Sequence, residues 1–337
     1  MTIPFISVRM KANKAFGVKH MPTQLISWLI VLFVLILVIG IMVLLRHLAI
    51  KRFRQAVKRA GYHESWSDTD GSIQKDILYD PKSGNGFDLY IPANPDPIKT
   101  QNLILFIHGG SWLFGNKNQI AYAAKRYAKA GYLTASMDYS LLSKESPEVD
   151  FFTMRDEIHL CIQKIKSHCE SQGININKIA LSGISAGGHL AMLYGYAQQH
   201  LSPIPIAFLA IQTGPSDFQT KTNKRYQQAL FNFITRRTGI DLKHARLDSE
   251  EVKAIKRQAS PISYIKEDSP PTLLAYGKRD KIVPFKNHDL LVQALENAKV
   301  PFTSFPFPNS GHLLADDPVQ RDAYHTAFLD YADRYFS

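Results

Sequence analysis

One stretch decides the fold of this chain: Lys178-Ile179-Ala180-Leu181-Ser182-Gly183-Ile184-Ser185-Ala186-Gly187-Gly188-His189-Leu190-Ala191. It changes from a short apolar run with polar ends, typical of a buried strand, to a pattern of small residues typical of a tightly packed helix. The G-x-S-x-G sequence of residues 183–187 lies at this change. Side chains at its two glycine positions would collide with the neighbouring strand and helix, and the Ser185 hydroxyl would stand at the positive end of the helix. The stretch predicts a nucleophile elbow; the alternative is a small serine in a glycine-rich turn.

The rest of the chain alternates between strand patterns and helix patterns. The predicted strands are 73–79, 87–91, 103–107, 132–137, 178–182, 206–211, 272–276 and 302–307, the first two joined as a hairpin. The predicted helices are 119–130, 151–171, 286–298 and 319–335. Such alternation favours right-handed crossovers, a mostly parallel sheet and the α/β class. In sheets of this kind, chemistry occurs at the carboxyl ends of the strands.

A second glycine-rich sequence, His108-Gly109-Gly110-Ser111-Trp112, follows the predicted strand 103–107 at that end. Two glycines just past a buried strand let backbone N–H groups face a cavity, as an oxyanion hole requires. An ordinary glycine turn is the alternative. We expect His108 to hold this loop in place.

A nucleophilic serine needs a base, and the base needs a carboxylate that fixes its tautomer. Asp280 follows the predicted strand 272–276, and His312 lies in a Gly/Pro-bounded loop before the last helix. The order Ser185, Asp280, His312 is the order of α/β-hydrolases. Alternatively, Asp280 is an ordinary surface carboxylate and His312 an ordinary loop imidazole. The residues that could then take their catalytic roles are Asp268, Asp316 and His288.

Together these features resemble the α/β-hydrolase superfamily, in the branch of esterases similar to hormone-sensitive lipase, acetyl-xylan and feruloyl esterases and arylformamidases. The matching segments are 108–112, 137–141, 183–188, 260–262, 277–284 and 311–312. The resemblance implies an α/β-hydrolase fold, with Ser185 as nucleophile and Asp280 and His312 as its partners. It also implies oxyanion donors from the backbone of Gly110, Ser111 and Ala186.

Two positions depart from that pattern. Ser111 stands where many relatives have a third glycine, and Ser140 stands where an arginine is common after the tyrosine. Neither removes a catalytic group. The predicted chemistry needs no metal or cofactor, and the histidines show no metal-ligand spacing.

Ten of the eleven net positive charges lie in the first 60 residues of the chain. Residues 1–60 contain ten Lys/Arg and no Asp/Glu, whereas the remaining residues contain 30 Lys/Arg and 29 Asp/Glu. The folded part is therefore nearly neutral, which argues against a nucleic-acid partner.

The basic residues at the start of the chain lie on both sides of an apolar run over residues 25–45. At about 1.5 Å per residue it spans roughly 30 Å, the thickness of a bilayer core. A buried core helix or a cleaved signal peptide are the alternatives, but the run is longer than a usual signal peptide and Arg46-His47-Leu48 follows it. We expect an uncleaved single-pass anchor. Six basic residues after the run against four before it favour a cytoplasmic catalytic domain.

Residues 46–72 are predicted to be a basic juxtamembrane segment and linker. Ile50, Phe53, Val57 and Ala60 recur there at helical spacing, which suits either a helix on an anionic membrane surface or a simple charge cluster. The only two cysteines, Cys161 and Cys169, lie too far apart on one predicted helix to form a disulfide.

Residues 215–258 are too long for a simple connection and are predicted to be a helical cap over the active site. They hold ten Lys/Arg against five Asp/Glu. This excess would face an anionic membrane or substrate, or else be a solvated lid surface.

The sequence thus predicts a basic tail (1–24), an anchor (25–45), a juxtamembrane linker (46–72) and an α/β-hydrolase domain (73–337). The predicted function is a membrane-anchored serine hydrolase that cleaves a small-molecule or lipid carboxylic ester through an acyl-enzyme. Two alternatives are an amide-cleaving relative, such as a peptidase or formamidase, and a non-catalytic membrane-tethered binding protein.

Overall fold

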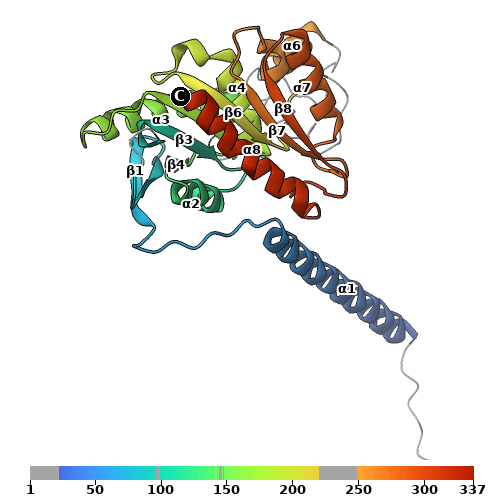
Figure 1. Cartoon of the computed structure of the whole chain (residues 1–337). Helices are drawn as coiled ribbons and strands as arrows, with labels where there is room; N and C mark the ends of the chain where they lie inside the picture. Colours follow the sequence, from blue (N-terminus) through green and yellow to red (C-terminus); the bar gives the residue numbers. More distant parts are fainter. Residues whose placement is uncertain (1–22, 96–98, 144–145, 147, 220–248) are drawn as a thin grey trace, which may run out of the picture. The chain divides into compact units, whose positions relative to one another are not determined.

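The computed structural model describes residues 23–95, 99–143, 146, 148–219 and 249–337 (Figure 1). The chain divides into two compact units, Met1–Arg54 and Gln55–Ser337. The predicted tail 1–24 lies outside the described residues except for its last two positions, and so does most of the predicted cap 215–258.

The first unit contains most of helix α1 (Thr23–Arg59). Its side chains over residues 27–45 are exposed, including Leu35 and Val38. Among the described helices it is the one that is long and apolar enough to cross a membrane, and a signal sequence near the N-terminus would meet the same criteria.

The second unit is built on a sheet of eight strands in the order β1-β2-β4-β3-β5-β6-β7-β8. The strands are β1 (Gly71–Asp80), β2 (Asn85–Pro92), β3 (Asn102–Ile107), β4 (Leu133–Met137), β5 (Lys178–Ile184), β6 (Ile206–Gln212), β7 (Thr272–Gly277) and β8 (Phe302–Phe307). The hairpin β1–β2 is antiparallel and joins β4 in antiparallel pairing, whereas all pairs from β4 to β8 are parallel. The predicted mostly parallel α/β sheet is confirmed.

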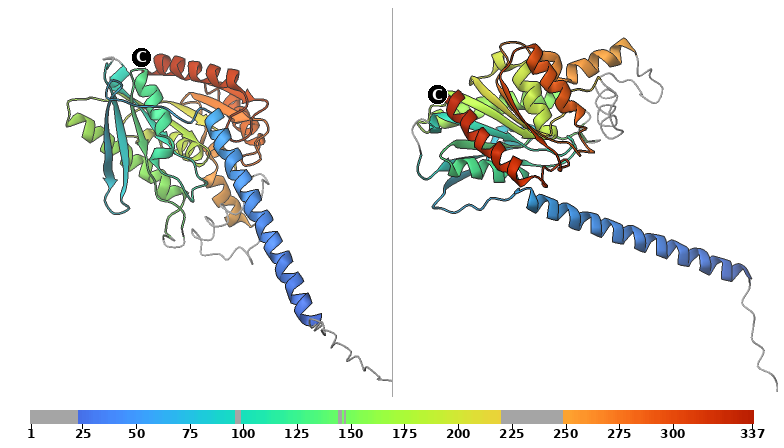
Figure 2. Two further views of the ribbon diagram at one scale, coloured as in Figure 1. Left: turned by 90° about the horizontal axis from the view of Figure 1, so that it is seen from below. Right: turned by 45° about the vertical axis from the view of Figure 1, so that its right-hand side comes forward.

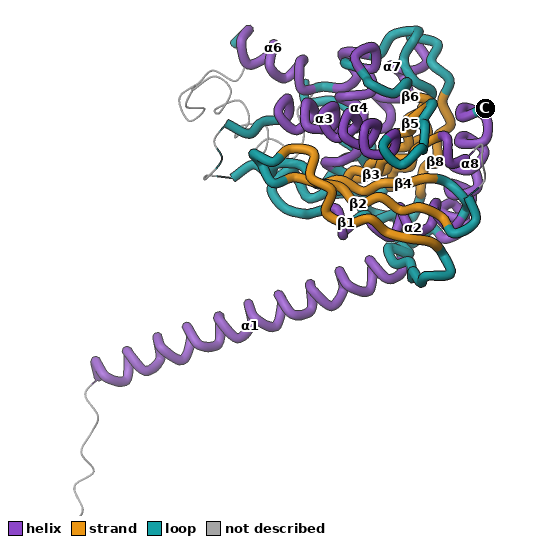
Figure 3. Tube along the Cα trace, turned by 90° about the vertical axis from the view of Figure 1, so that its left-hand side faces the viewer, coloured by secondary structure: helices purple, strands orange, loops and turns teal. Residues whose placement is uncertain are grey.

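Helices cover both faces of the sheet (Figure 3). The helices are α2 (Ala121–Lys129), α3 (Phe151–Glu170), α4 (Ala186–Ala197), α6 (Glu250–Ala259), α7 (Lys286–Asn297) and α8 (Pro318–Phe336). Buried residues of α2 and α8 share one core cluster, and those of α3, α4, α6 and α7 share the other. Helix α8 packs against β5, β6, β7 and β8 (Figure 2). These layers hold the carboxyl ends of the parallel strands at one edge, where the candidate site lies.

The element boundaries agree with the sequence pattern to within a few residues. The fully buried strand β3 is the continuous apolar run that a central parallel strand requires. Helix α3 begins where the Asp150 side chain accepts hydrogen bonds from the N–H groups of Phe152 and Thr153. Cys161 and Cys169 are both buried on α3 and form no disulfide.

Candidate active site

Ser185 occupies the sharp turn between β5 and α4. Its φ of 56° and ψ of −121° are strained for a residue with a side chain. The turn is held because the Ser185 N–H donates to the Gln212 carbonyl at 2.9 Å and the Ser185 carbonyl accepts from His189 N–H at 3.0 Å. The side chain therefore stands at the first turn of α4, where the helix dipole favours negative charge.

Both glycine positions of the G-x-S-x-G sequence lie so close to neighbouring backbone that no side chain fits there, as predicted. A methyl group on Gly187 would lie 2.1 Å from the Ile107 carbonyl oxygen, and one on Gly183 would lie 2.3 Å from the Gly187 carbonyl oxygen. Real Cβ atoms do not approach backbone this closely. The elbow can form only with glycine at both positions.

The structure brings Ser185, His312 and Asp280 together. Nε2 of His312 lies 2.9 Å from the Ser185 hydroxyl oxygen, and Nδ1 of His312 lies 2.7 Å from Oδ2 of Asp280. The other carboxylate oxygen of Asp280 accepts the N–H groups of Ile282 at 2.7 Å and Val283 at 2.9 Å. Because Asp280 accepts from three donors, its side chain is fixed, and His312 is orientated with Nδ1–H toward it.

The substitutes considered from sequence lie elsewhere. Asp316 pairs with Arg59 at 3.1 Å, and His288 contacts Ser304 and Asp289. Asp268 is exposed on the surface. Within the described residues, none of these three side chains hydrogen-bonds Ser185 or His312.

The loop after β3 lies against the elbow. A methyl group on Gly109 would be 3.2 Å from Cβ of Ser185. Gly110 has a φ of 128°, and a methyl group there would overlap the Phe114 carbonyl oxygen at 1.7 Å. Ser111 also has a positive φ, of 55°. The loop therefore adopts a conformation that turns its backbone sharply beside the serine.

Three backbone N–H groups at this place have no acceptor in the part of the chain that the structure describes. They belong to the residues expected from the sequence to be oxyanion donors: Gly110, Ser111 and Ala186. Buried or half-buried N–H groups without a protein partner are uncommon and are the groups that a substrate oxyanion can use.

His108 and Tyr139 hold the start of this loop. The His108 ring stacks on Tyr139 with 4.2 Å between centroids, and its Nδ1–H donates to the Gly109 carbonyl at 2.7 Å. The Tyr139 hydroxyl donates to the His108 carbonyl at 2.9 Å. Burial lowers the pKa of His108, so the ring is neutral near pH 7. This is the holding role expected for His108.

The departure at Ser140 has a structural counterpart that sequence reasoning missed. The N–H and hydroxyl of Ser140 both donate to the buried carboxylate of Glu157, and the amide of Asn85 donates to it at 3.1 Å. Burial raises the pKa of Glu157. The Glu157 carboxylate is thus bound by neutral donors. An arginine at position 140 would instead have placed a positive charge beside it.

His189 is a second residue that the sequence did not single out. It is fully buried between the rings of Trp112, Phe151 and Phe218, at 5.1 to 5.3 Å between centroids. Its Nε2–H donates to the Ala259 carbonyl at 2.9 Å, and burial lowers its pKa to about 4. It joins the elbow helix to the end of α6. No spacing rule identifies such a core histidine.

A sequence profile identifies the family. The BD-FAE profile matches residues 87–295, which include the loop after β3, the elbow and Asp280. The chain belongs to the BD-FAE family. It is an α/β-hydrolase of the esterase and lipase type, as the sequence resemblance implied. No group of three or more His, Cys, Asp or Glu side chains arranged to hold a metal ion occurs among the described residues of this BD-FAE member.

Two of the curated relatives of this BD-FAE chain are named as an esterase and as a methylesterase. Esterase LipC of Mycobacterium tuberculosis is 25% identical over 242 residues, which are 67% of this chain and 55% of that protein. The probable isoprenylcysteine alpha-carbonyl methylesterase ICME of Oryza sativa subsp. japonica is 32% identical over 136 residues, 40% of this chain and 30% of that protein. The chain spans about half the length of LipC and less of ICME.

Solved structures share the fold. Esterase B from Lactobacillus rhamnosis has a TM-score of 0.64 at 20% identity and covers 87% of this chain and 95% of its own. A truncated carbohydrate esterase from gut microbiota has a TM-score of 0.63 at 18% identity and covers 80% of this chain and 100% of its own. At these identities the likeness establishes the α/β-hydrolase fold.

Proposed function

We propose that this chain hydrolyses carboxylic esters, with Ser185 as nucleophile, His312 as general base and acid, and Asp280 as the group that orients the imidazole. The observation that carries the proposal is the pair of hydrogen-bond distances, 2.9 Å from Ser185 Oγ to His312 Nε2 and 2.7 Å from His312 Nδ1 to Asp280 Oδ2. Nucleophile, base and orienting carboxylate within such reach are the arrangement of a serine hydrolase.

In the proposed reaction, the hydroxyl oxygen of Ser185 attacks the ester carbonyl carbon while His312 Nε2 takes the hydroxyl proton. The N–H groups of Gly110, Ser111 and Ala186 stabilise the oxyanion of the tetrahedral intermediate. The intermediate collapses, the alkoxide leaves with the proton from His312, and the acyl group stays on Ser185. Water then attacks the acyl-enzyme, giving its proton to His312, and the carboxylic acid leaves as the proton returns to Ser185.

The relatives favour an ester over an amide as the substrate. LipC and ICME are named as an esterase and a methylesterase. We therefore propose a small-molecule or lipid ester as the substrate, and the amide-cleaving and non-catalytic alternatives become outcomes of the test below.

We also propose that residues 25–45 anchor the enzyme in a membrane, with the tail 1–24 before them and the linker 46–72 and hydrolase domain 73–337 after them. The length and apolar composition of α1 support the anchor. The compact unit that contains the sheet begins at Gln55, so the last part of the linker packs with the hydrolase domain. The basic residues after the run favour the cytoplasmic side for that domain.

A fluorophosphonate probe tests the catalytic proposal on the full chain in detergent. We expect the probe to label the wild type, and Ser185→Ala to lose both the label and the hydrolysis of short p-nitrophenyl esters. The rates of hydrolysis of p-nitroanilides with the same acyl groups show whether the enzyme prefers esters or amides. A wild type that neither takes the label nor cleaves any of these substrates would contradict an enzymatic function.

A further inference from the structure

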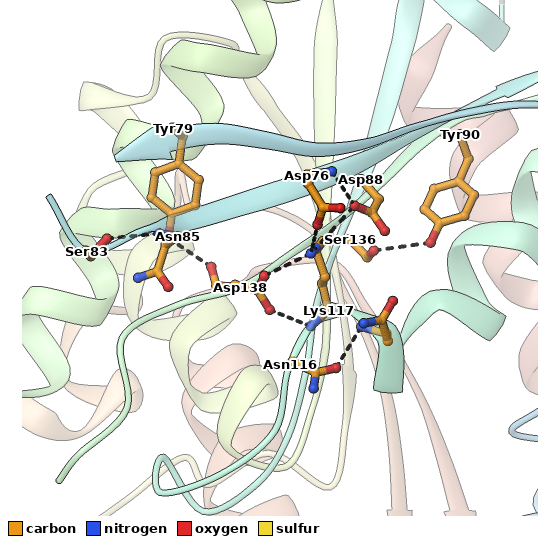
Figure 4. A network of polar contacts seen from close by, with 11 residues as sticks. Asp76, Tyr79, Ser83, Asn85, Asp88, Tyr90, Asn116, Lys117, Ser136 and Asp138 are labelled. Atoms are coloured by element: carbon orange, nitrogen blue, oxygen red, sulfur yellow. Dashed lines mark hydrogen bonds and ion pairs between the residues drawn. The ribbon is translucent and has the colours of Figure 1, made fainter. Parts of the chain in front are cut away.

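The loop that carries the proposed oxyanion donors ends at Lys117, whose side chain enters a cluster of three carboxylates (Figure 4). Its Nζ lies 2.7 Å from Asp76 Oδ1, 3.2 Å from Asp138 Oδ2 and 3.7 Å from Asp88 Oδ1. The Lys117 side chain is only 10% exposed. A lysine this buried is uncommon unless it is paired, and here three acids surround it.

The three acids come from three neighbouring strands. Asp76 lies in β1, Asp88 in β2, and Asp138 directly after β4. Asp138 binds the loop twice, because its Oδ1 also accepts the backbone N–H of Lys117 at 2.7 Å. One ammonium group thus joins the end of the loop to the side of the sheet that contains the hairpin.

The backbone of β1 is deformed at the place where it supplies its carboxylate. Asp76 has a φ of 55°, and the β1–β2 register shifts between Gln74 and Ile77. The Asp76 N–H donates to Asp88 Oδ1 at 2.9 Å instead of to the ladder. Bulges of this kind re-aim a side chain near active sites, and here the side chain is aimed at Lys117.

The charges in the cluster and its burial shift the pKa values of its members. Burial opposes the charged form of Lys117, yet the hydrogen bond to Asp76 and the charges of Asp138 and Asp88 raise its pKa. The hydrogen bond to Lys117 lowers the pKa of Asp76, whereas burial raises the pKa of Asp88. Removing the ammonium would therefore leave three carboxylates close together without the cation that pairs with all of them, although the charge of Lys75 still acts on Asp76 and Asp88.

A short rigid path leads from Lys117 to the oxyanion donors. Gly115 packs so tightly that a methyl group there would lie 2.6 Å from both the Gly109 carbonyl oxygen and His108 Nδ1. The Gly110 carbonyl accepts the N–H of Leu113 at 3.0 Å and that of Phe114 at 3.1 Å. The loop is therefore a closed turn whose far end contacts the residues just before the oxyanion donors.

We propose that Lys117 is a positioning residue for the oxyanion hole, a role that rests on the function proposed above. Its ion pairs fix the far end of the loop so that the N–H groups of Gly110 and Ser111 stay aimed beside Ser185. The oxyanion forms only in the transition state, so loss of this support lowers kcat and leaves KM nearly unchanged.

The experiment compares Lys117→Met with Lys129→Met, each in the full chain in detergent. Lys129 is a matched control because it also bridges two carboxylates, Glu64 at 3.1 Å and Asp70 at 3.6 Å, but lies on α2 away from the loop. We expect Lys117→Met to lower kcat by about 10- to 100-fold with KM within about twofold, as for a misplaced catalytic group. Lys129→Met should keep the wild-type kcat, and Lys117→Arg should recover most of the loss.

A milder variant keeps the test decisive if Lys117→Met fails to fold. Asp76 is 75% exposed, so Asp76→Asn removes the shortest ion pair without leaving a buried group unpaired. We expect it to lower kcat by about threefold to tenfold, again with KM unchanged.

Each outcome decides between the two proposals. The positioning role is overturned if Lys117→Met and Asp76→Asn both keep the wild-type kcat. It is also overturned if these variants raise KM and do not lower kcat. In both cases the proposed ester hydrolysis is unaffected. If Lys117→Met does not fold, a wild-type kcat in Asp76→Asn is enough to overturn the positioning role. A wild-type chain that is neither labelled by the fluorophosphonate nor active overturns the proposed function and the positioning role together.

Discussion

The imidazole of His312 and the hydroxyl of Ser185 are separated by 127 positions in the chain, and their polar atoms lie 2.9 Å apart. Ser185 follows β5, and His312 lies in the loop between β8 and α8. The parallel part of the sheet makes this possible because its strands, from β4 to β8 in the strand order, present their carboxyl ends at one edge. The predictions below depend on how this edge and its surroundings are held.

Asp280→Asn should reduce kcat by about 10³- to 10⁴-fold with little change in KM. The oxygen of the new amide will accept from the N–H groups of Ile282 and Val283, which now bind Asp280 Oδ1. The amide NH₂ then faces His312 Nδ1, and the ring must place its proton on Nε2, where it cannot accept the Ser185 proton.

Asp289→Asn is the matched control for that change. Asp289 also contacts a histidine nitrogen, Nδ1 of His288, at 2.9 Å, but its side chain is 63% exposed and does not touch the proposed site. Steady-state kinetics with a p-nitrophenyl ester should give wild-type values for this variant. Equal kcat for Asp280→Asn and Asp289→Asn would be incompatible with the orienting role of Asp280.

Gly187→Ala should destabilise the fold by about 3 kcal/mol or more, because the added methyl group overlaps backbone that cannot move away. Its nearest neighbour would be the Ile107 carbonyl oxygen at 2.1 Å. Gly84→Ala is the comparison, since its φ of 74° is unfavourable for alanine but nothing lies within 4 Å of the new atom. That change should cost about 1 kcal/mol. Urea unfolding measures both, and similar midpoints would refute the packing argument for the elbow.

The folded domain should lose stability as the pH falls from 6.5 toward 4. Burial lowers the pKa of His189 from 6.5 to about 4, and burial together with the nearby Arg126 charge lowers that of His325 to about 4. Between these pH values the unfolded chain binds more protons than the folded one, so stability is complete above pH 6.5 and declines below it. Each histidine contributes on the order of 3 kcal/mol to this loss.

His189→Gln tests that dependence, because glutamine keeps a donor for the Ala259 carbonyl and does not titrate. Urea midpoints between pH 4 and 7 should fall less steeply for this variant than for the wild type, and His325→Gln should have a similar effect. A wild-type slope in both variants would show that other groups control the acid sensitivity.

The proposed anchor predicts that the full chain stays with membranes after alkaline carbonate washing and that its intact mass includes the N-terminal segment. Leu35→Arg together with Val38→Arg should release it, since each arginine costs about 3 kcal/mol at the middle of a bilayer. Leu160→Arg on the exposed side of α3 is the control and should remain bound. A mass lacking the apolar run would instead identify a cleaved signal sequence.

The sequence predicted the elements that repeat a known local rule. The elbow glycines and the strand ends follow from requirements within a few residues, whereas the roles of Ser185, Asp280 and His312 were predicted because their order is that of α/β-hydrolases. The Lys117 cluster could not be predicted this way, because it depends on a bulge in β1 and on the lateral order of β1, β2 and β4. His189 and Glu157 were missed for a similar reason, since their roles arise from contacts between segments that are distant along the chain.

The bulge at Asp76 also has a consequence for how copies of this protein meet. β1 has a neighbour on only one side within the described sheet, and the open side of an edge strand is where a strand of another copy can add. The bulge between Gln74 and Ile77 bends this strand, and bent edge strands pair less readily with an approaching strand. We therefore expect the deformation that aims Asp76 at Lys117 also to disfavour edge-to-edge association of copies of the domain.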